Sequence, residues 1–345
     1  MIDKTSGGGL PLISGRKLFF YFSVFVLATL VANGICYFYY SPAIQIANHE
    51  KFTDLKNITS NHNPHGDEGY GNITIDQNGF NNQSKFPIED SRIVCIGSSQ
   101  TEAQHVGSNE NFVSLINQEY PEAKAYNIGI SASTFASTFF RIVPLTEKFP
   151  NAHVFIFEIN SMPSLDDLER MEKILSENNV PEKDISWKNG NFILKTMGTI
   201  PLCRLLWKQY DHQRKNADSK PVKKECFDGE SYEYYLRHVL SLGKKKAGNT
   251  DLVIFYLART KLDKNGEIEI SEDDGQNAIF KKACKDIGIN YLDMAEPFTE
   301  SYRREHVLPY GFLNSRIGTG HLNIYGHRII ADSLEKILED GAYIR

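Results

Sequence analysis

The stretch RIVCIGSSQTEAQHV, residues 92–106, joins a short apolar run to a polar turn. The apolar run predicts a buried strand that stops at Gly97, and Ser98 and Ser99 follow directly. Serine is a preferred residue at the start of a helix, so one interpretation is a simple helix cap. The other interpretation is a strand end that lifts a serine hydroxyl out of a sheet into a cleft. The rest of the chain has to decide between the two.

Beyond this stretch, apolar runs alternate with segments of helical periodicity. Predicted strands lie at 92–96, 123–129, 153–160, 251–259 and 290–294, and predicted helices at 134–149, 275–288 and 323–340, with a helical stretch around 112–116. Pro144 is expected to interrupt or kink the helix at 134–149. Strands that alternate with helices and are apolar throughout predict a parallel sheet covered on both faces. The predicted fold class is therefore α/β, a flavodoxin-like three-layer αβα sandwich with a mostly parallel sheet.

The rhythm of strand and helix stops between residues 164 and 248. This stretch contains helical segments with a charged middle, and it is interpreted as an insertion over the carboxyl edge of the sheet that acts as a lid. Ligand sites in open α/β sheets lie at that edge.

The N-terminal region differs from the rest of the chain. Residues 18–40 carry no charge and are long enough to cross the hydrocarbon core of a bilayer as a helix. Arg16 and Lys17 precede this run and no Lys or Arg follows it before Lys51, so the positive-inside rule places the N-terminus in the cytoplasm. The predicted organisation is a cytoplasmic tail at 1–17, a transmembrane helix at 18–40, a polar stem at 41–82 and an extracytoplasmic α/β domain at 83–345.

Composition excludes some classes of partner. The net charge is −5 and no basic stripe interleaved with aromatic residues is present, so nucleic acid is not an expected partner. The five cysteines show no framework or metal-ligand spacing, although Cys203 and Cys226 could pair in an oxidising compartment. No Walker motif, dinucleotide fingerprint or His/Cys metal cluster occurs, so the sequence implies neither a cofactor nor a metal.

Four polar segments follow predicted strands or precede the last helix: residues 97–101, 127–134, 158–161 and 318–327. Because all four would meet at one edge of the sheet, they predict a site for acyl transfer. Ser99 is the candidate nucleophile, and His321 is the candidate base that takes its proton. The backbone N–H groups near Ser99 and Ala132 and the side-chain amide of Asn160 are the candidate donors to an oxyanion.

These segments resemble the four short blocks of the SGNH, or GDSL-type, hydrolase family, over roughly residues 79–338 with the insertion excepted. The matching positions are Gly97, Ser99, Thr101, Asn127, Gly129, Asn160, His321, Asn323 and Gly326. The chain departs from the blocks at Ser98, Ala132, Glu158, Ser161 and Gly318. The segment IDQNGFNN, residues 75–82, is also similar to the entry segment of membrane-anchored, extracytoplasmic members that modify cell-surface polysaccharides.

The departure at Gly318 bears directly on activity, because the family carries the acid of its catalytic triad at that position. Three alternatives remain open at the position of the acid. A backbone carbonyl of the turn at residues 316–320 gives a Ser–His dyad, or a carboxylate comes from elsewhere, or the site is inactive. The candidate replacement acids are Asp293, Glu296 and Glu305. His327 is expected to pack in the interior rather than act as a base.

The resemblance implies a membrane-anchored serine esterase or O-acyltransferase that acts outside the membrane on an acylated glycan or a lipid-linked substrate. A catalytically silent binding or scaffold protein with the same fold is the alternative, and Gly318 is the feature that favours it.

Overall fold

The computed structural model describes residues 15–39, 59–62, 68–69, 71–83, 86–177, 200, 202–203, 206, 228–270 and 275–344. At its centre lies a five-stranded sheet in which all neighbouring strands are parallel. In spatial order the strands are β4 (Ala125–Asn127), β3 (Ile93–Ile96), β5 (Val154–Ile159), β6 (Asp251–Tyr256) and β9 (Asn290–Asp293). Numbered along the chain this order is 2-1-3-4-5, the flavodoxin-like arrangement. The predicted fold class is confirmed.

The two faces of the sheet bury alternate residues of each strand. On β5, Phe155 and Phe157 face one core while Val154 and Ile156 face the other, and all four side chains are fully buried. Burial of each side chain stabilises the fold by about 1.5–3 kcal/mol, which explains why the strands are apolar throughout.

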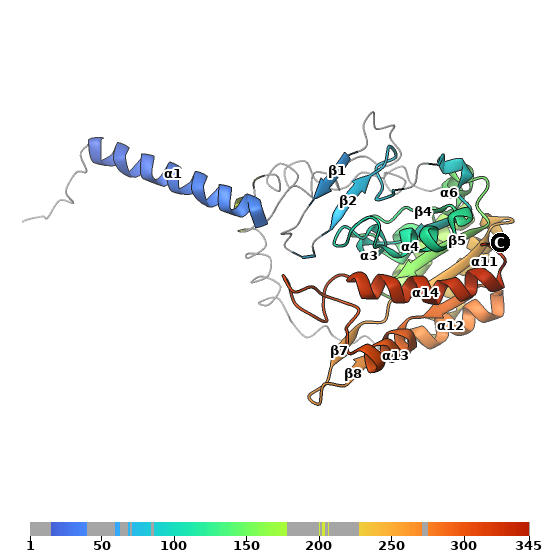
Figure 1. Ribbon diagram of the computed structural model, residues 1–345. Coiled ribbons are helices and arrows are strands. Elements are labelled where there is room, and N and C mark those ends of the chain that lie inside the picture. The colour runs from blue at the N-terminus through green and yellow to red at the C-terminus, as the bar shows by residue number, and fades with distance from the viewer. Residues whose placement is uncertain are drawn as a thin grey trace, which may run out of the picture.

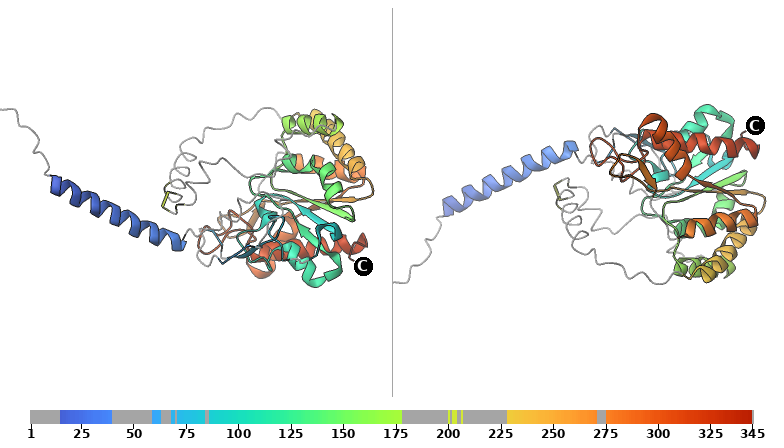
Figure 2. Two further views of the ribbon diagram at one scale, coloured as in Figure 1. Left: turned by 90° about the horizontal axis from the view of Figure 1, so that it is seen from above. Right: turned by 90° about the horizontal axis from the view of Figure 1, so that it is seen from below.

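Helices cover both faces (Figures 1 and 2). The first core is closed by α5 (Phe135–Phe139), α6 (Ile142–Lys148), α7 (Leu165–Glu177), α11 (Gly229–Ala247) and α12 (Gln276–Ile287). The second is closed by α4 (Phe112–Glu119), α13 (Ala295–Glu305) and α14 (Ile324–Asp340). Smaller elements are α3 (Ser99–Glu102), the turns Ile88–Asp90 and Pro121–Ala123, and the hairpin of β7 (Thr260–Leu262) and β8 (Ile268–Ile270).

The predicted helix at 134–149 is two helices. The chain leaves helical geometry between Phe139 and Ile142, and Pro144 lies in the first turn of α6. A proline in the first turn gives up no intrahelical hydrogen bond, so the break falls just before it rather than at it.

The predicted boundary of the stem at residue 82 was wrong. Strand β2 (Asn72–Ile75) pairs with β1 (Thr59–His62), and Ile73 and Ile75 are buried. The turn that follows is held to the sheet, because Asn82 exchanges hydrogen bonds with the main chain of Asn127 at 2.9 and 3.0 Å. Polar side chains of residues 72–82 form hydrogen bonds to the α/β domain. This part of the supposed stem therefore belongs to that domain.

The predicted insertion at 164–248 also needs a correction at its two ends. Helices α7 and α11 pack against each other and close the first core, with Leu168, Met171, Leu236 and Leu240 buried. These helices are therefore a layer of the sandwich rather than a lid over its edge. Most of the segment between them, including Cys226, lies outside the described residues, and Cys203 carries a free thiol.

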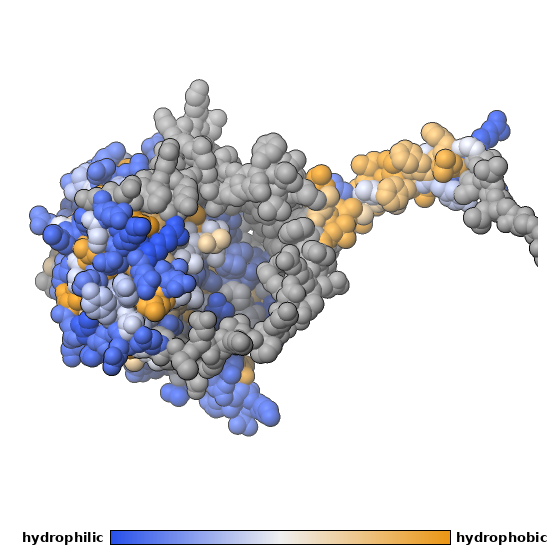
Figure 3. Space-filling model, turned by 180° about the vertical axis from the view of Figure 1, so that it is seen from behind, coloured by the Kyte–Doolittle hydropathy of each residue, from blue (hydrophilic) through white to orange (hydrophobic). Residues whose placement is uncertain are grey.

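Helix α1 (Gly15–Tyr39) is the one helix in the described part of the chain that is long and apolar enough to cross a membrane. Its large side chains, such as Leu18, Phe19 and Phe25, are exposed, and the apolar surface is concentrated on it in Figure 3. A buried core helix would not leave these side chains in water.

At Gly129 the loop after β4 approaches the backbone of α3 closely. A Cβ atom there would lie 2.1 Å from the backbone nitrogen of Glu102 and 2.6 Å from its Cα. Because backbone atoms cannot rotate away, we expect Gly129→Ala to destabilise the fold by about 3 kcal/mol or more. Thermal unfolding measures this cost. Gly266→Ala is the matched control: it has a positive φ but open space around it, so it should cost only about 1 kcal/mol. Equal stability of Gly129→Ala and the wild type would contradict the packing.

Candidate active site

Ser98 and Ser99 divide the two roles that the sequence left open. Ser98 is the N-cap of α3: its hydroxyl accepts the N–H of Gln100 at 3.2 Å and donates to Glu158 at 2.5 Å. Ser99 is the first residue of the helix and faces the other way. Its Oγ lies 2.9 Å from Nε2 of His321, so the predicted contact between Ser99 and His321 is confirmed. The helix-cap interpretation therefore holds for Ser98, whereas the role of Ser99 as a nucleophile stays a prediction that its contact with His321 supports.

Gln100 holds the turn that carries His321, a part that sequence reasoning missed. Its side-chain oxygen accepts the N–H of Leu322 at 2.8 Å and its amide donates to the carbonyl of Gly320 at 3.2 Å. On the other side, Asn323 caps α14 by accepting the N–H of Gly326 at 3.0 Å. The main chain is therefore fixed on both sides of His321, which limits where its imidazole can lie.

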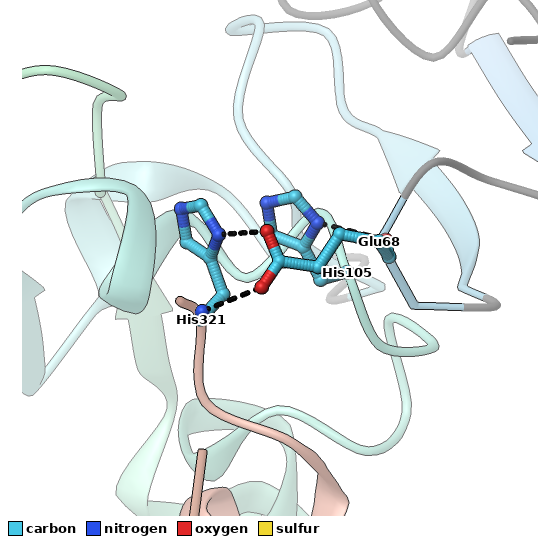
Figure 4. A group of neighbouring side chains, drawn as sticks. All are labelled: Glu68, His105 and His321. Carbon is cyan, nitrogen blue, oxygen red and sulfur yellow. Dashed lines mark hydrogen bonds and ion pairs between the residues drawn. The ribbon is translucent and has the colours of Figure 1, made fainter. Parts of the chain in front are cut away.

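The carboxylate beside His321 comes from Glu68 (Figure 4). One oxygen, Oε2, lies 2.8 Å from Nδ1 of the His321 ring, and the other, Oε1, accepts the main-chain N–H of His321 at 2.7 Å. A carboxylate at Nδ1 requires the proton on that nitrogen, so Nε2 is left free to accept the Ser99 hydroxyl. Ser99, His321 and Glu68 form one hydrogen-bonded chain.

Gly320 makes room for this carboxylate. A Cβ atom at Gly320 would lie 2.1 Å from Oε1 of Glu68, and the residue has a φ of +88°. Gly318, where the resembling family has its acid, has a φ of +84°. Gly320 therefore leaves the space that the Glu68 carboxylate occupies, whereas a side chain at Gly318 would meet Leu308.

The predicted sources of the acid were wrong. Asp293 accepts the main-chain N–H of Ala295 at 2.9 Å and the side-chain amide of Asn277 at 2.7 Å, Glu305 pairs with Arg304, and Glu296 is exposed in the first turn of α13. No carbonyl of the 316–320 turn bonds the ring either; within the described residues, Nδ1 has Glu68 as its partner. The carboxylate of Glu68 already fills this position, and the three candidates are engaged elsewhere or face solvent.

The electrostatics suit an ionised acid. Burial by itself raises the pKa of Glu68, but the hydrogen bonds and charge of His321 together lower it below its ordinary value. Glu68 is therefore a carboxylate at neutral pH, and it stabilises the positive charge that His321 acquires when it takes a proton.

The predicted oxyanion donors are the amides that the local hydrogen bonds leave unused. From residue 98 to 103, every backbone N–H other than that of Ser99 donates to an acceptor within the protein, and from 127 to 134 the same holds for every N–H other than that of Ala132. Ala132 has a φ of +63°, the left-handed conformation that glycine adopts most easily. The side chain of Asn160 lines the same cavity as His321.

Glu158 holds the first turn of α3 through hydrogen bonds. It is 2 % exposed, and it accepts the N–H groups of Ser98 and Thr101 at 3.2 and 2.9 Å together with both of their hydroxyls. Burial raises the pKa of Glu158 above its ordinary value. Its partners lie in α3 rather than in the cavity, which supports the structural interpretation of this residue.

A cavity of about 400 Å³ opens beside His321 at the carboxyl end of the sheet. Several polar side chains line it, among them Gln100, Asn160, Arg259, Thr260, Lys261 and Thr319. Hydroxyl, amide and cationic side chains of this kind bind sugar hydroxyls and charged groups through hydrogen bonds.

Glu68, His105 and His321 bring three potential metal-ligand atoms within 4.8 Å of one another. Both ring nitrogens of His321 already take part in the hydrogen-bonded chain, and the two imidazole rings are stacked 3.8 Å apart. Stacked rings direct their in-plane lone pairs side by side rather than toward one ion. The geometry therefore fits proton transfer better than metal binding.

Chelators provide a direct check on that assignment. We expect EDTA to leave ester turnover unchanged, because no step of the Ser99–His321–Glu68 chain needs an ion. Excess Zn²⁺ should inhibit by competing for His321. Loss of activity in EDTA that Zn²⁺ restores would show that the three residues hold a metal instead.

His327 and two of the cysteines were expected to be structural, and the structure shows them buried. His327 is 1 % exposed and stacks on Phe112, and burial lowers its pKa to about 3, so it packs as a neutral residue. Cys95 and Cys284 are buried free thiols whose pKa is raised by burial. These three residues belong to the core.

Comparison with known proteins gives only remote similarity. No family model and no curated protein matches the chain. Among solved structures, similar chains include a G-D-S-L lipolytic protein from Veillonella parvula (11 % identity, 72 % of this chain, 98 % of that chain, TM-score 0.38). An acetyl xylan esterase shows 13 % identity over 72 % of this chain and 99 % of that chain, with a TM-score of 0.39. Phospholipase A1 from Streptomyces albidoflavus shows 12 % identity over 71 % of this chain and 98 % of that chain, with a TM-score of 0.38. Similarity this low carries no argument about activity, which has to rest on the geometry of the site.

Proposed function

We propose that this chain is a serine hydrolase or O-acyltransferase of the SGNH type that uses Ser99, His321 and Glu68 as its triad. The observation that carries the proposal is the hydrogen-bonded chain from Ser99 Oγ through both ring nitrogens of His321 to Glu68. The scaffold alternative drew its support from Gly318, and Glu68 now supplies the acid that Gly318 lacks.

The chemistry follows from the positions of these groups. Ser99 Oγ attacks the ester carbonyl while His321 Nε2 takes its proton, and Glu68 stabilises the imidazolium. The unused N–H groups of Ser99 and Ala132 and the amide of Asn160 receive the oxyanion. His321 then returns the proton to the leaving alkoxide. An acyl-Ser99 ester remains, which water or a sugar hydroxyl cleaves in a second step with the same base.

The proposed substrate is an acylated glycan or a lipid-linked acylated saccharide. The support is the set of hydroxyl, amide and cationic side chains that line the cavity beside His321, because such groups can bind the hydroxyl groups of a saccharide. Helix α1 supports a membrane anchor, with the α/β domain on the extracytoplasmic side because Arg16 and Lys17 precede it.

A fluorophosphonate probe tests the proposed chemistry on the full chain in detergent. We expect covalent labelling of Ser99 and turnover of a chromogenic acetyl ester. Addition of an oligosaccharide acceptor separates the two outcomes: an acyltransferase yields acylated oligosaccharide, whereas a hydrolase yields free acid alone. A folded protein with neither labelling nor turnover would overturn the proposal and favour a binding protein.

The proposed topology has its own test. Protease added to intact cells should digest the α/β domain and leave a fragment that contains residues 18–40. Protection of the whole domain until the membrane is broken would contradict the extracytoplasmic placement.

A further inference from the structure

His105 contacts both members of the His321–Glu68 pair, and nothing in the triad chemistry requires it. It lies in the turn after α3, and Figure 4 shows its ring beside that of His321. We propose that His105 is a positioning residue that holds the plane of the His321 imidazole and the main chain that carries Glu68. This inference rests on the proposed function of the triad.

The first contact is a stack of the two rings. The ring centroids of His105 and His321 are 3.8 Å apart and the planes differ by 24°. The ring of Phe312 is also near that of His105, with centroids 6.3 Å apart and planes tilted by 41°. A ring supported in this way limits rotation of His321 about its side-chain bonds, so Nε2 stays directed at Ser99.

The second contact holds the acid. Nδ1 of His105 lies 3.0 Å from the main-chain carbonyl oxygen of Glu68. A carbonyl oxygen only accepts, so Nδ1 carries the proton in this contact. The neighbouring Gly69 packs against the backbone of His105 and exchanges two hydrogen bonds with the Asn314 side chain, at 3.0 and 2.9 Å. His105 and Asn314 therefore fasten the segment that presents Glu68 to the site.

The surroundings keep His105 neutral at physiological pH. Burial and the charge of His321 lower its pKa to about 4, against the opposing effects of Glu68 and Glu102. A neutral ring can lie against His321 when that residue becomes positive during the reaction, whereas a second imidazolium would repel it.

Two substitutions separate the contacts. His105→Phe keeps an aromatic ring and loses the N–H donor, whereas His105→Asn keeps a donor near the Nδ1 position and loses the ring. His105→Ala loses both. His153→Asn is the control, because His153 is exposed and precedes β5 at the opposite end of the sheet.

The measurements are kcat and KM for an acetyl ester and the NMR signal of the His321 Nδ1 proton in the full chain in detergent, since this signal reports the hydrogen bond to Glu68. We expect His105→Ala to lower kcat about 10- to 100-fold with little change in KM. His105→Phe should move the Nδ1 proton signal upfield, because a loosened Glu68 makes a weaker hydrogen bond to the ring. His105→Asn should keep that signal and still lose kcat. The control should match the wild type in every measurement.

The outcomes separate this inference from the proposed function. If His105→Ala and His105→Phe lower only the thermal stability and leave kcat and the His321 Nδ1 proton signal unchanged, the positioning role is wrong. If the wild type has no esterase activity, the proposed function fails. The Nδ1 proton signal still reports whether His105 holds the His321–Glu68 pair.

Discussion

Replacement of Ser99 by alanine is expected to lower kcat for ester cleavage by about six orders of magnitude, the scale seen when a triad nucleophile is removed. The reason is that Ser99 supplies the one hydroxyl within hydrogen-bonding distance of His321 Nε2 among the described residues. Without it, only oxyanion stabilisation and substrate binding remain. The fluorophosphonate label should disappear at the same time.

Ser98→Ala is the matched control for this experiment. Ser98 is adjacent in sequence, but its hydroxyl serves as the cap of α3 and as a donor to Glu158. We expect it to cost about 1 kcal/mol of stability through the lost cap and to keep the label. Labelling that survives in Ser99→Ala and disappears in Ser98→Ala would place the nucleophile one residue earlier.

Glu68→Gln is expected to lower kcat by about four orders of magnitude, as the loss of the acid does in the serine-protease template. Both oxygens of Glu68 are used, one by the main-chain N–H of His321 and one by its ring Nδ1. An amide has a single oxygen, so its NH₂ group must face one of these two donors. When it faces Nδ1, it favours the tautomer that presents a proton rather than a lone pair to Ser99.

The pH dependence of stability gives a second measurement on the same residue. Because the pKa of Glu68 is lower in the folded state, its ionised form stabilises the fold above the ordinary pKa of a glutamate. This contribution is lost as the pH falls through the folded pKa. The difference in stability between wild type and Glu68→Gln should therefore be present at pH 7 and shrink in acid.

Asp293→Asn is the control for the choice of acid, since Asp293 was a candidate on sequence grounds and bonds Asn277 instead. Its activity should match that of the wild type. A loss of activity in Asp293→Asn together with full activity in Glu68→Gln would refute the triad. Each result points to one carboxylate, because neither residue contacts the other's partner.

The local sequence pattern was enough to predict the site residues that follow the ends of strands. Ser99 follows β3 after Gly97 and Ser98, Asn160 comes directly after β5, and parallel strands bring such positions to one edge. The distinction between Ser98 and Ser99 was also accessible, since successive residues leave a strand in opposite directions. His321 was identifiable from its place just before the last helix.

Glu68 could not be predicted from the local sequence pattern. It lies 253 positions before His321, in a polar stretch with no periodicity and no motif. The signal that remained was indirect: two glycines at 318 and 320 where a side chain would be expected, which is a sign that another group approaches closely. Such a signal shows that space is needed but not which residue fills it.

The sequence by itself determined the alternation of strands and helices, the apolar N-terminal helix, and the serine and histidine at the sheet edge, because each depends on residues near one another in the chain. The tertiary structure decided the acid, the role of His105 and the packing of α7 and α11 as a layer of the sandwich. Those features depend on contacts between segments that are distant in the chain. Burial and hydrogen bonds determine which residues make these contacts, and local periodicity does not predict them.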